Sequence, residues 1–315
     1  MKIISTKKDR EAFFRKLKKR SRGVDPAIIK TTEKIISSVR LRGDPTLRAF
    51  TRKFDGHETI RLSASQIASI AKKADPGTVR ALSKAAKRIK RFHERQMEGT
   101  WEIKEPGIRL GQLIRPLERV GVYVPGGKAA YPSTVLMNVI PAQVAGVKEI
   151  ALVTPTPGGE ADPNVMAAIE LLGVKEAYSI GGAQAVAALA YGTKSIRGVD
   201  KIVGPGNIYV ATAKRMVYGE VDIDMIAGPS EILIIADSDA RPDFIAADLL
   251  SQAEHDELAS PVLVTDSRSL AEQVNIELDS QIKKLPKSRT ARASLRRYGA
   301  AILVRDMEEA ARVSN

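Results

Sequence analysis

The sequence predicts an α/β protein in which helices cover parallel sheets. Short β-branched segments such as EIALVTP and PVLVTD alternate with helix-like segments through the second half of the chain, and this alternation is typical of parallel sheets with helices on both faces. Aromatic residues make up only 4% of the chain, so the core must be built from Ala, Val, Ile and Leu. The chain has no cysteine, which excludes disulfides, thiolate metal sites and cysteine nucleophiles.

The first hundred residues predict an α-helical section. From Asp9 to about Gln96 the apolar residues recur at helical spacing, interrupted at 23–26, 43–45 and 75–77. Each interruption contains glycine and proline, which offer stop and restart signals for helices. The segment IRLGQLIRPLERVGVYVPGG then alternates apolar and polar residues up to a Pro-Gly-Gly turn, so it predicts strands.

The rest of the chain predicts further rounds of helix and strand. Helical patterns cover 134–147, 165–173, 183–192, 207–219 and 241–255, and helical material continues from about 267 to Leu295. Strand patterns cover 149–155, 176–180, 201–204, 222–228, 232–237, 261–266 and 300–306. Glycine-rich corners separate many of these segments, as expected for connections in such a layered fold.

Three glycine-bearing corners predict where a ligand could bind. They are VYVPGGKAAYPS, SIGGAQA and IVGPGNIY, and each follows a predicted strand, where ligands sit in parallel α/β layers. None matches G-x-G-x-x-G, since Gly204-Pro-Gly206 lacks the third glycine. Each corner alone fits a tight turn at least as well as a phosphate cradle, but three together favour a nucleotide. A fourth corner, IAGPSEIL, places Ser230 where its hydroxyl can reach a substrate or satisfy the loop backbone.

The net charge of +13 raises the question of nucleic-acid binding. The basic excess lies at the two ends of the chain, whereas the centre is acidic. Cations in EAFFRKLKKR and LSKAAKRIKRF alternate with apolar residues at helical spacing. This favours solvated helix faces over an RNA-binding stripe, and we predict no nucleic-acid partner. A basic rim can also attract an anionic cofactor.

The sequence predicts a cytoplasmic protein without a membrane span. The start, MKIISTKKDREAFF, is too charged for a secretory signal. The longest uncharged stretch, 129–147, contains two prolines, Asn138 and Gln143, which a membrane span would tolerate poorly.

His255 is a candidate metal ligand together with Gln252. The two residues are three apart near the end of a predicted helix, so their side chains share a face, and an imidazole nitrogen and a carboxamide oxygen can both ligate a metal. The spacing alone favours a structural histidine at a helix C-terminus, because Gln-x-x-His is a weak motif. His57 and His93 lie in charged segments predicted to be exposed, and we assign them no chemistry.

Six motifs in order resemble the histidinol dehydrogenase family. They are VGVYVPGG, YPSTVLMNVIPAQVAGV, SIGGAQAVAALAYGT, DKIVGPGNIYVATAKR, IDMIAGPSEILIIAD and DLLSQAEHD, and they extend from about Gly121 to Asp256. The resemblance implies an oxidoreductase of histidine biosynthesis that uses zinc and NAD. Such an enzyme oxidises L-histidinol through L-histidinal to L-histidine and passes a hydride to NAD in each step.

The resemblance also implies roles for individual residues. NAD would be contacted by Tyr123, Gln184 and Asn207. The substrate would be contacted by Ser230, Gln252 and His255, and the last two would also bind zinc. We expect Tyr123 and Asn207 to be partly exposed and close together, because both follow strands on one edge of the predicted sheet.

The chain departs from the family at its end. Family members continue beyond Asn315, and their Glu-His acid/base pair and two further metal ligands lie in that later part. No histidine follows His255, so we assign no catalytic residue within this chain. We therefore expect the amino-terminal part of a histidinol dehydrogenase, a homodimer at full length, with little activity alone. The alternative is a truncated, non-catalytic relative that serves as a binding module.

The resemblance finally implies two intertwined three-layer α/β/α domains. Residues 123–230 would form one domain, an incomplete Rossmann-like unit that contributes to NAD binding. The helical section 1–122 would join residues 231–315 in the other domain.

Overall fold

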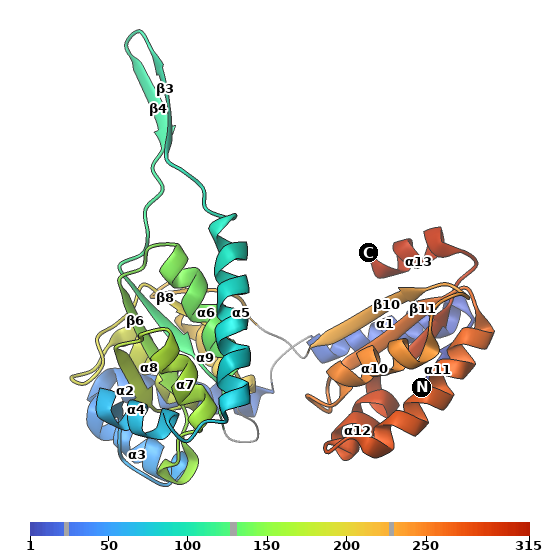
Figure 1. Cartoon of the computed structure of the whole chain (residues 1–315), viewed down its shortest axis with the longest axis horizontal. Coiled ribbons are helices and arrows are strands. Elements are labelled where there is room, and N and C mark those ends of the chain that lie inside the picture. Colours follow the sequence, from blue (N-terminus) through green and yellow to red (C-terminus); the bar gives the residue numbers. More distant parts are fainter. Residues whose placement is uncertain (22–24, 127–130, 227–229) are drawn as a thin grey trace. The chain divides into compact units, whose positions relative to one another are not determined.

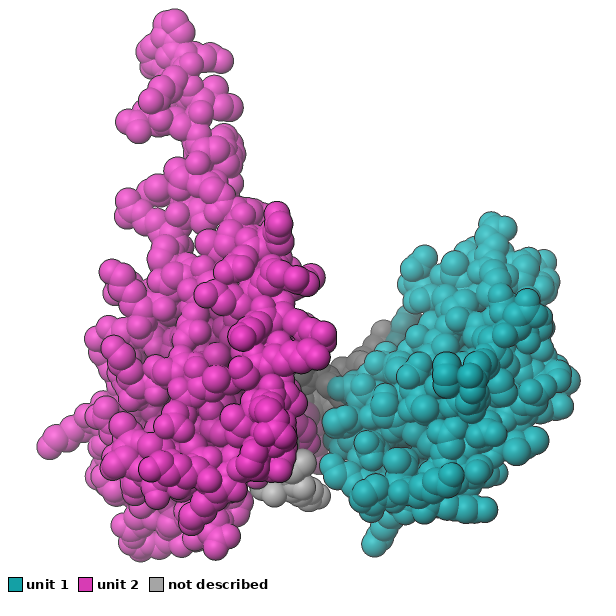
Figure 2. All heavy atoms as spheres, in the orientation of Figure 1, with its two compact units in different colours: residues 1–23, 228–315 teal, residues 24–227 magenta. Residues whose placement is uncertain are grey.

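The computed structural model describes residues 1–21, 25–126, 131–226 and 230–315. Contacts within the chain divide it into two compact units, coloured separately in Figure 2. Unit 1 comprises residues 1–23 and 228–315, and unit 2 comprises residues 24–227. The chain therefore begins in unit 1, builds the whole of unit 2, and then returns to complete unit 1.

Unit 1 is a parallel sheet between two helical layers. Its four strands have the order β1-β12-β11-β10, and all neighbours are parallel. Leu249, Val274 and Leu263 belong to the core on one side, whereas Phe13 and Val264 belong to the core on the other. The elements are β1 (Lys2–Ile4), α1 (Lys7–Ser21), β10 (Glu231–Ala236), α10 (Pro242–Ala253), β11 (Ser260–Thr265), α11 (Arg268–Gln281), η2 (Ile282–Lys284), α12 (Ser288–Tyr298), β12 (Ala300–Leu303) and α13 (Met307–Ser314).

Unit 2 has a mixed sheet of six strands with the order β2-β7-β6-β5-β8-β9. Only β2 (Arg61–Leu62) runs antiparallel to its neighbour, β7 (Glu176–Ser179). The other strands are β5 (Arg119–Tyr123), β6 (Glu149–Thr154), β8 (Lys201–Val203) and β9 (Asp222–Ile223). The chain moves outward from β5 through β6 to β7, and then places β8 on the opposite side of β5. Such a reversal of strand order creates a topological switch point, where ligands bind in α/β sheets.

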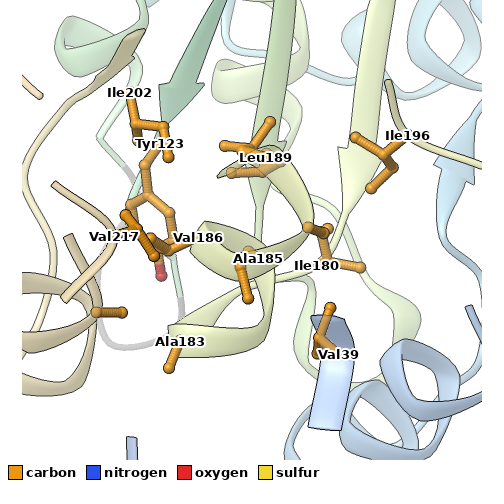
Figure 3. Close-up of a cluster of buried hydrophobic side chains, with 14 of the residues drawn as sticks. Val39, Tyr123, Ile180, Ala183, Ala185, Val186, Leu189, Ile196, Ile202 and Val217 are labelled. Carbon is orange, nitrogen blue, oxygen red and sulfur yellow. The ribbon is translucent and has the colours of Figure 1, made fainter. Parts of the chain in front are cut away.

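Helices form a separate apolar core on each side of this sheet. One core contains α2 (Pro26–Arg42), α3 (Asp44–Asp55), α8 (Gly182–Tyr191) and α9 (Ile208–Val217). The other contains α4 (Ala64–Ala71), α5 (Pro76–Glu94), α6 (Pro132–Val144) and α7 (Pro163–Leu171). A short 3-10 turn, η1 (Pro157–Gly159), follows β6. Figure 3 shows the first core, in which Leu189 and Val186 of α8 lie near Ile180 and Tyr123.

A two-stranded antiparallel hairpin projects from unit 2. It consists of β3 (Trp101–Glu105) and β4 (Ile108–Gln112), and every residue of both strands is exposed. Figure 1 shows it extending away from the sheet of the same unit.

The α/β class is confirmed by this architecture, with a parallel sheet in unit 1 and a mixed sheet in unit 2. The grouping of the helical section differs from the one that the sequence suggested, because residues 24–122 belong to unit 2 rather than to the unit that contains 231–315. The reason is packing: α2 contacts α8 and α9, and α5 contacts α6 and α7. Among the described residues, no helix is both long and apolar enough to cross a membrane.

Candidate functional site

A cavity of about 480 Å³ lies in unit 2 at the carboxyl ends of β5, β7 and β8. Tyr123, Gln184 and Asn207 all line it, although they come from three separate corners of the chain. The wall also includes Ile35, Lys53, Phe54, Asp55, Pro125, Pro155, Gly182 and Tyr209. The volume lies in the range of cavities that bind small molecules and cofactors.

Tyr123, the last residue of β5, anchors one wall of the cavity. It is only 2% exposed, contrary to the expectation of partial exposure. Its ring lies among core residues such as Val186 and Val217, with the hydroxyl directed toward the start of α8 (Figure 3). The hydroxyl accepts a hydrogen bond from the backbone nitrogen of Gly182 at 3.0 Å. Burial raises the pKa of Tyr123 to about 12, so the hydroxyl keeps its hydrogen and can donate it.

The start of α8 brings its backbone to the cavity. Gly182 has φ +63°, a value that side-chain-bearing residues rarely adopt. A Cβ at Gly181 would lie 2.5 Å from the ring of Pro155. The N-cap residue, Gly181, has no side chain to cap the helix, and the N-terminus of a helix favours a negatively charged ligand. Gln184 lies in this turn and is 2% exposed.

Asn207 caps α9 at the third corner. Its Oδ1 accepts hydrogen bonds from the backbone nitrogens of Tyr209 at 3.0 Å and Val210 at 3.2 Å. The carboxamide nitrogen takes no part in this cap, and the residue is exposed. Asn207 therefore has a structural role that leaves its donor group available for a ligand.

A buried ion pair holds the corner before Asn207. Lys214 is 2% exposed, and its Nζ donates to the carbonyl of Gly204 at 2.9 Å and pairs with Asp224. Asp224 in turn accepts a hydrogen bond from the backbone nitrogen of Gly204 at 2.7 Å. Gly204 itself is pressed against the end of β5, where a Cβ would collide with the carbonyl oxygen of Tyr123.

Asp55 and His57 are features of this region that the sequence did not single out. Asp55 ends α3, lines the cavity and is 8% exposed, and burial raises the pKa of its carboxyl group. His57, predicted to be exposed, is half-buried. Its Nε2 lies 3.0 Å from Thr156 Oγ1 and 3.3 Å from Ser179 Oγ. The only signal for Asp55 in the sequence is that a glycine follows it, and Asp-Gly is common in turns.

The remaining candidates belong to unit 1. Ser230 is exposed and immediately precedes β10. Gln252, in the last turn of α10, is half-buried, and the exposed His255 donates from its backbone nitrogen to the Gln252 carbonyl at 3.2 Å. The neighbouring motif positions 227–229, and positions 127–130 of the first glycine corner, lie outside the described residues.

The described residues do not complete a zinc site. Among them no group of three or more His, Cys, Asp or Glu side chains is arranged to hold a metal ion. Gln252 and His255 offer one oxygen and one nitrogen donor, which is half of the usual tetrahedral set.

Comparisons with known proteins agree on one family. The model of the family "Histidinol dehydrogenase" matches residues 18–315. The chain is 54% identical over 288 residues to the histidinol dehydrogenase of Geobacter sulfurreducens, covering 89% of this chain and 67% of that protein. It is 49% identical over 311 residues to the enzyme of Lactococcus lactis, covering 97% of this chain and 72% of that protein.

A solved structure shows the same fold. The crystal structure of histidinol dehydrogenase from Elizabethkingia anophelis superposes with a TM-score of 0.92 at 34% sequence identity. The match covers 100% of this chain and 73% of that one.

Proposed function

Since the chain belongs to the histidinol dehydrogenase family, we propose that unit 2 binds NAD for the oxidation of L-histidinol through L-histidinal to L-histidine. One observation carries the proposal. Tyr123, Gln184 and Asn207, to which the family resemblance assigns NAD contacts, line a single cavity at the switch point of the sheet. Bound NAD would supply the hydride acceptor for each oxidation step.

The protein's own groups would position the cofactor. The Tyr123 hydroxyl, which accepts from Gly182, has its hydrogen left to donate to the ligand. The carboxamide nitrogen of Asn207, at the third corner, offers a second donor. The N-terminus of α8, whose N-cap residue has no side chain, suits a phosphate oxygen.

The metal and substrate contacts are proposed on the resemblance alone. Gln252 and His255 would hold zinc and L-histidinol, and Ser230 would contact the substrate. Because the described residues supply only two of the donors that zinc usually takes, we derive no catalytic step through the metal. The resemblance also leads us to propose that the protein is cytoplasmic and forms a homodimer, and sedimentation of the protein would test the homodimer.

Isothermal titration of the 315-residue chain with NAD tests the cofactor site. We expect Gln184→Ala and Asn207→Asp to weaken NAD binding at least about tenfold, the effect of losing one hydrogen bond to the cofactor. Asn207→Asp keeps an oxygen that caps α9 but replaces the amide donor with a negative charge, which a helix N-terminus favours, so its stability should at least match the wild type. Gln273→Ala, an exposed glutamine on α11 of unit 1, is the control. If Gln184→Ala and Asn207→Asp bind NAD as tightly as the wild type and the Gln273→Ala control, this cavity is not the cofactor site.

A further inference from the structure

Asp55 has an oxygen that the fold leaves without a partner. Its Oδ2 is buried and has no hydrogen-bond partner among the described residues, while the side chain lines the same cavity as Tyr123 and Gln184. Buried polar groups in proteins are nearly always hydrogen-bonded, and a buried carboxylate is costly when it is not. A buried carboxyl group with an unpaired oxygen, on a side chain that lines a cavity, therefore favours a ligand that brings a donor.

Neighbouring charges do not satisfy this carboxylate. His57 lies close enough to lower the pKa of Asp55, although burial has the larger, opposite effect. The His57 Nδ1 is itself buried without a hydrogen-bond partner among the described residues. Arg52 forms its ion pair with Glu58, and the Nζ of Lys53 lies 5.4 Å from the ring centroid of Phe54. Asp55 thus remains free to accept a hydrogen bond from a molecule in the cavity.

The chemistry of a carboxylate restricts the part of the ligand that it can meet. An ionised carboxylate only accepts hydrogen bonds, so it suits a hydroxyl or amino group and repels a phosphate. The ribose of an adenylate offers two adjacent hydroxyls, and acidic side chains meet such hydroxyls in other dinucleotide sites. A phosphate on the 2′ position would replace one donor with two negative charges beside Asp55.

We propose that Asp55 accepts hydrogen bonds from the adenosine ribose hydroxyls of the dinucleotide and selects NAD over its 2′-phosphorylated form. This inference rests on the proposed function, since it assigns a specificity-determining residue to the same cavity. The supporting observations are that Asp55 is buried, that its Oδ2 has no hydrogen-bond partner among the described residues, and that it lines the same cavity as Tyr123 and Gln184.

The test compares Asp55→Asn with the wild-type chain by titration with NAD, 2′-deoxy-NAD and NADP. A hydrogen bond to a charged group has a free energy that corresponds to about 10- to 100-fold in affinity. We therefore expect wild type to bind NAD at least tenfold more tightly than either analogue. Asp55→Asn should bind NAD about tenfold more weakly and lose most of the discrimination against NADP. Glu170→Gln, the same charge change at an exposed position of α7, should behave as wild type.

Thermal unfolding of the ligand-free proteins separates this role from a structural one. Asp55→Asn removes a buried charge that lacks a hydrogen bond, so its melting temperature should equal or exceed that of the wild type. A lower melting temperature with unchanged selectivity would show that Asp55 only supports the fold, and would overturn the inference. Unchanged NAD and NADP affinities in Asp55→Asn would also overturn it, while wild-type NAD binding that depends on Gln184 would leave the proposed function intact. If wild type does not bind NAD at all, both the function and the inference fail.

Discussion

We expect Lys214→Met to destabilise unit 2 by about 3 kcal/mol, because Lys214 holds the corner that carries Asn207. In the native protein, its ammonium group donates to the Gly204 carbonyl at 2.9 Å and pairs with Asp224, which accepts from the Gly204 nitrogen at 2.7 Å. Methionine fills a similar volume but removes both interactions. The Gly204 carbonyl and the Asp224 carboxylate then lose their common partner.

The size of this effect follows from the burial of the two partners. Breaking a fully buried ion pair costs about 3–5 kcal/mol, and a hydrogen bond to a charged group contributes about 1.5–3 kcal/mol. The side chain of Lys214 is 3% exposed but that of Asp224 is 29% exposed, so water partly compensates the carboxylate and the lower end applies. Lys201→Met is the matched control. Lys201 of β8 pairs with Asp222 of β9, and their side chains are 31% and 51% exposed. An exposed pair of this kind contributes about 0–1 kcal/mol.

Hydrogen exchange in increasing urea, followed by mass spectrometry of peptides, measures the free energy of unfolding of each unit separately. This matters because a chain of two compact units need not unfold in one transition. Peptides of β5, β6 and α9 should lose protection in Lys214→Met at lower urea, while those of β11 and α11 should not change. If Lys214→Met lowers the free energy of unfolding of unit 2 by less than about 1 kcal/mol, or by no more than Lys201→Met does, the buried Lys214–Asp224 pair does not hold this corner.

Two further outcomes concern the glycine corner and the pH dependence of unit 1. Gly204→Ala should destabilise unit 2 by about 3 kcal/mol or more, because Gly204 has φ +109° and its new Cβ would collide with the Tyr123 carbonyl. Gly219 has φ +104° but open space around it, so Gly219→Ala should lower the free energy of unfolding by only about 1–2 kcal/mol. Equal melting temperatures of the two variants would contradict this prediction. Hydrogen bonds lower the pKa of Glu309 from 4.5 to about 2, and the bond from the Arg305 backbone has the largest effect. The stability that the ionised Glu309 contributes is therefore complete above pH 4.5 and is lost as the pH falls through about 2. Urea unfolding of Glu309→Gln should therefore show a deficit at pH 7 that shrinks toward pH 2, whereas a deficit independent of pH would exclude this linkage.

Strong local patterns in the sequence explain why most elements could be predicted. The run EIALVT forms β6 and SPVLVT forms β11, because buried parallel strands are continuous apolar segments. Asp25 and Asp75 each precede a proline and cap α2 and α5, as helix start signals predict. In contrast, β1 and β2 have only three and two residues, too few to show a period. Their strand conformation depends on pairing with β12 and β7.

The grouping of helices into units could not be read from the sequence for a related reason. The buried residues Ile35, Ile36 and Val39 give α2 an apolar face, which indicates that the helix packs on something. The pattern does not identify the partner, and the partner proves to be α8 and α9. Likewise, Asp55 lines a cavity together with strand ends and a helix start that lie far along the chain, so no local sequence motif predicts its place there.

The cavity residues show how one side chain can serve both the fold and a ligand. Asn207 uses its oxygen to cap α9, and Tyr123 uses its hydroxyl oxygen to accept from Gly182. In each case the donor half of the group takes no part in the structural bond. Asp55, which can only accept, has an oxygen left over instead. Two donors and one acceptor that line one cavity suit a ligand that carries both phosphate oxygens and hydroxyls, and this supports the proposed dinucleotide over a simple anion.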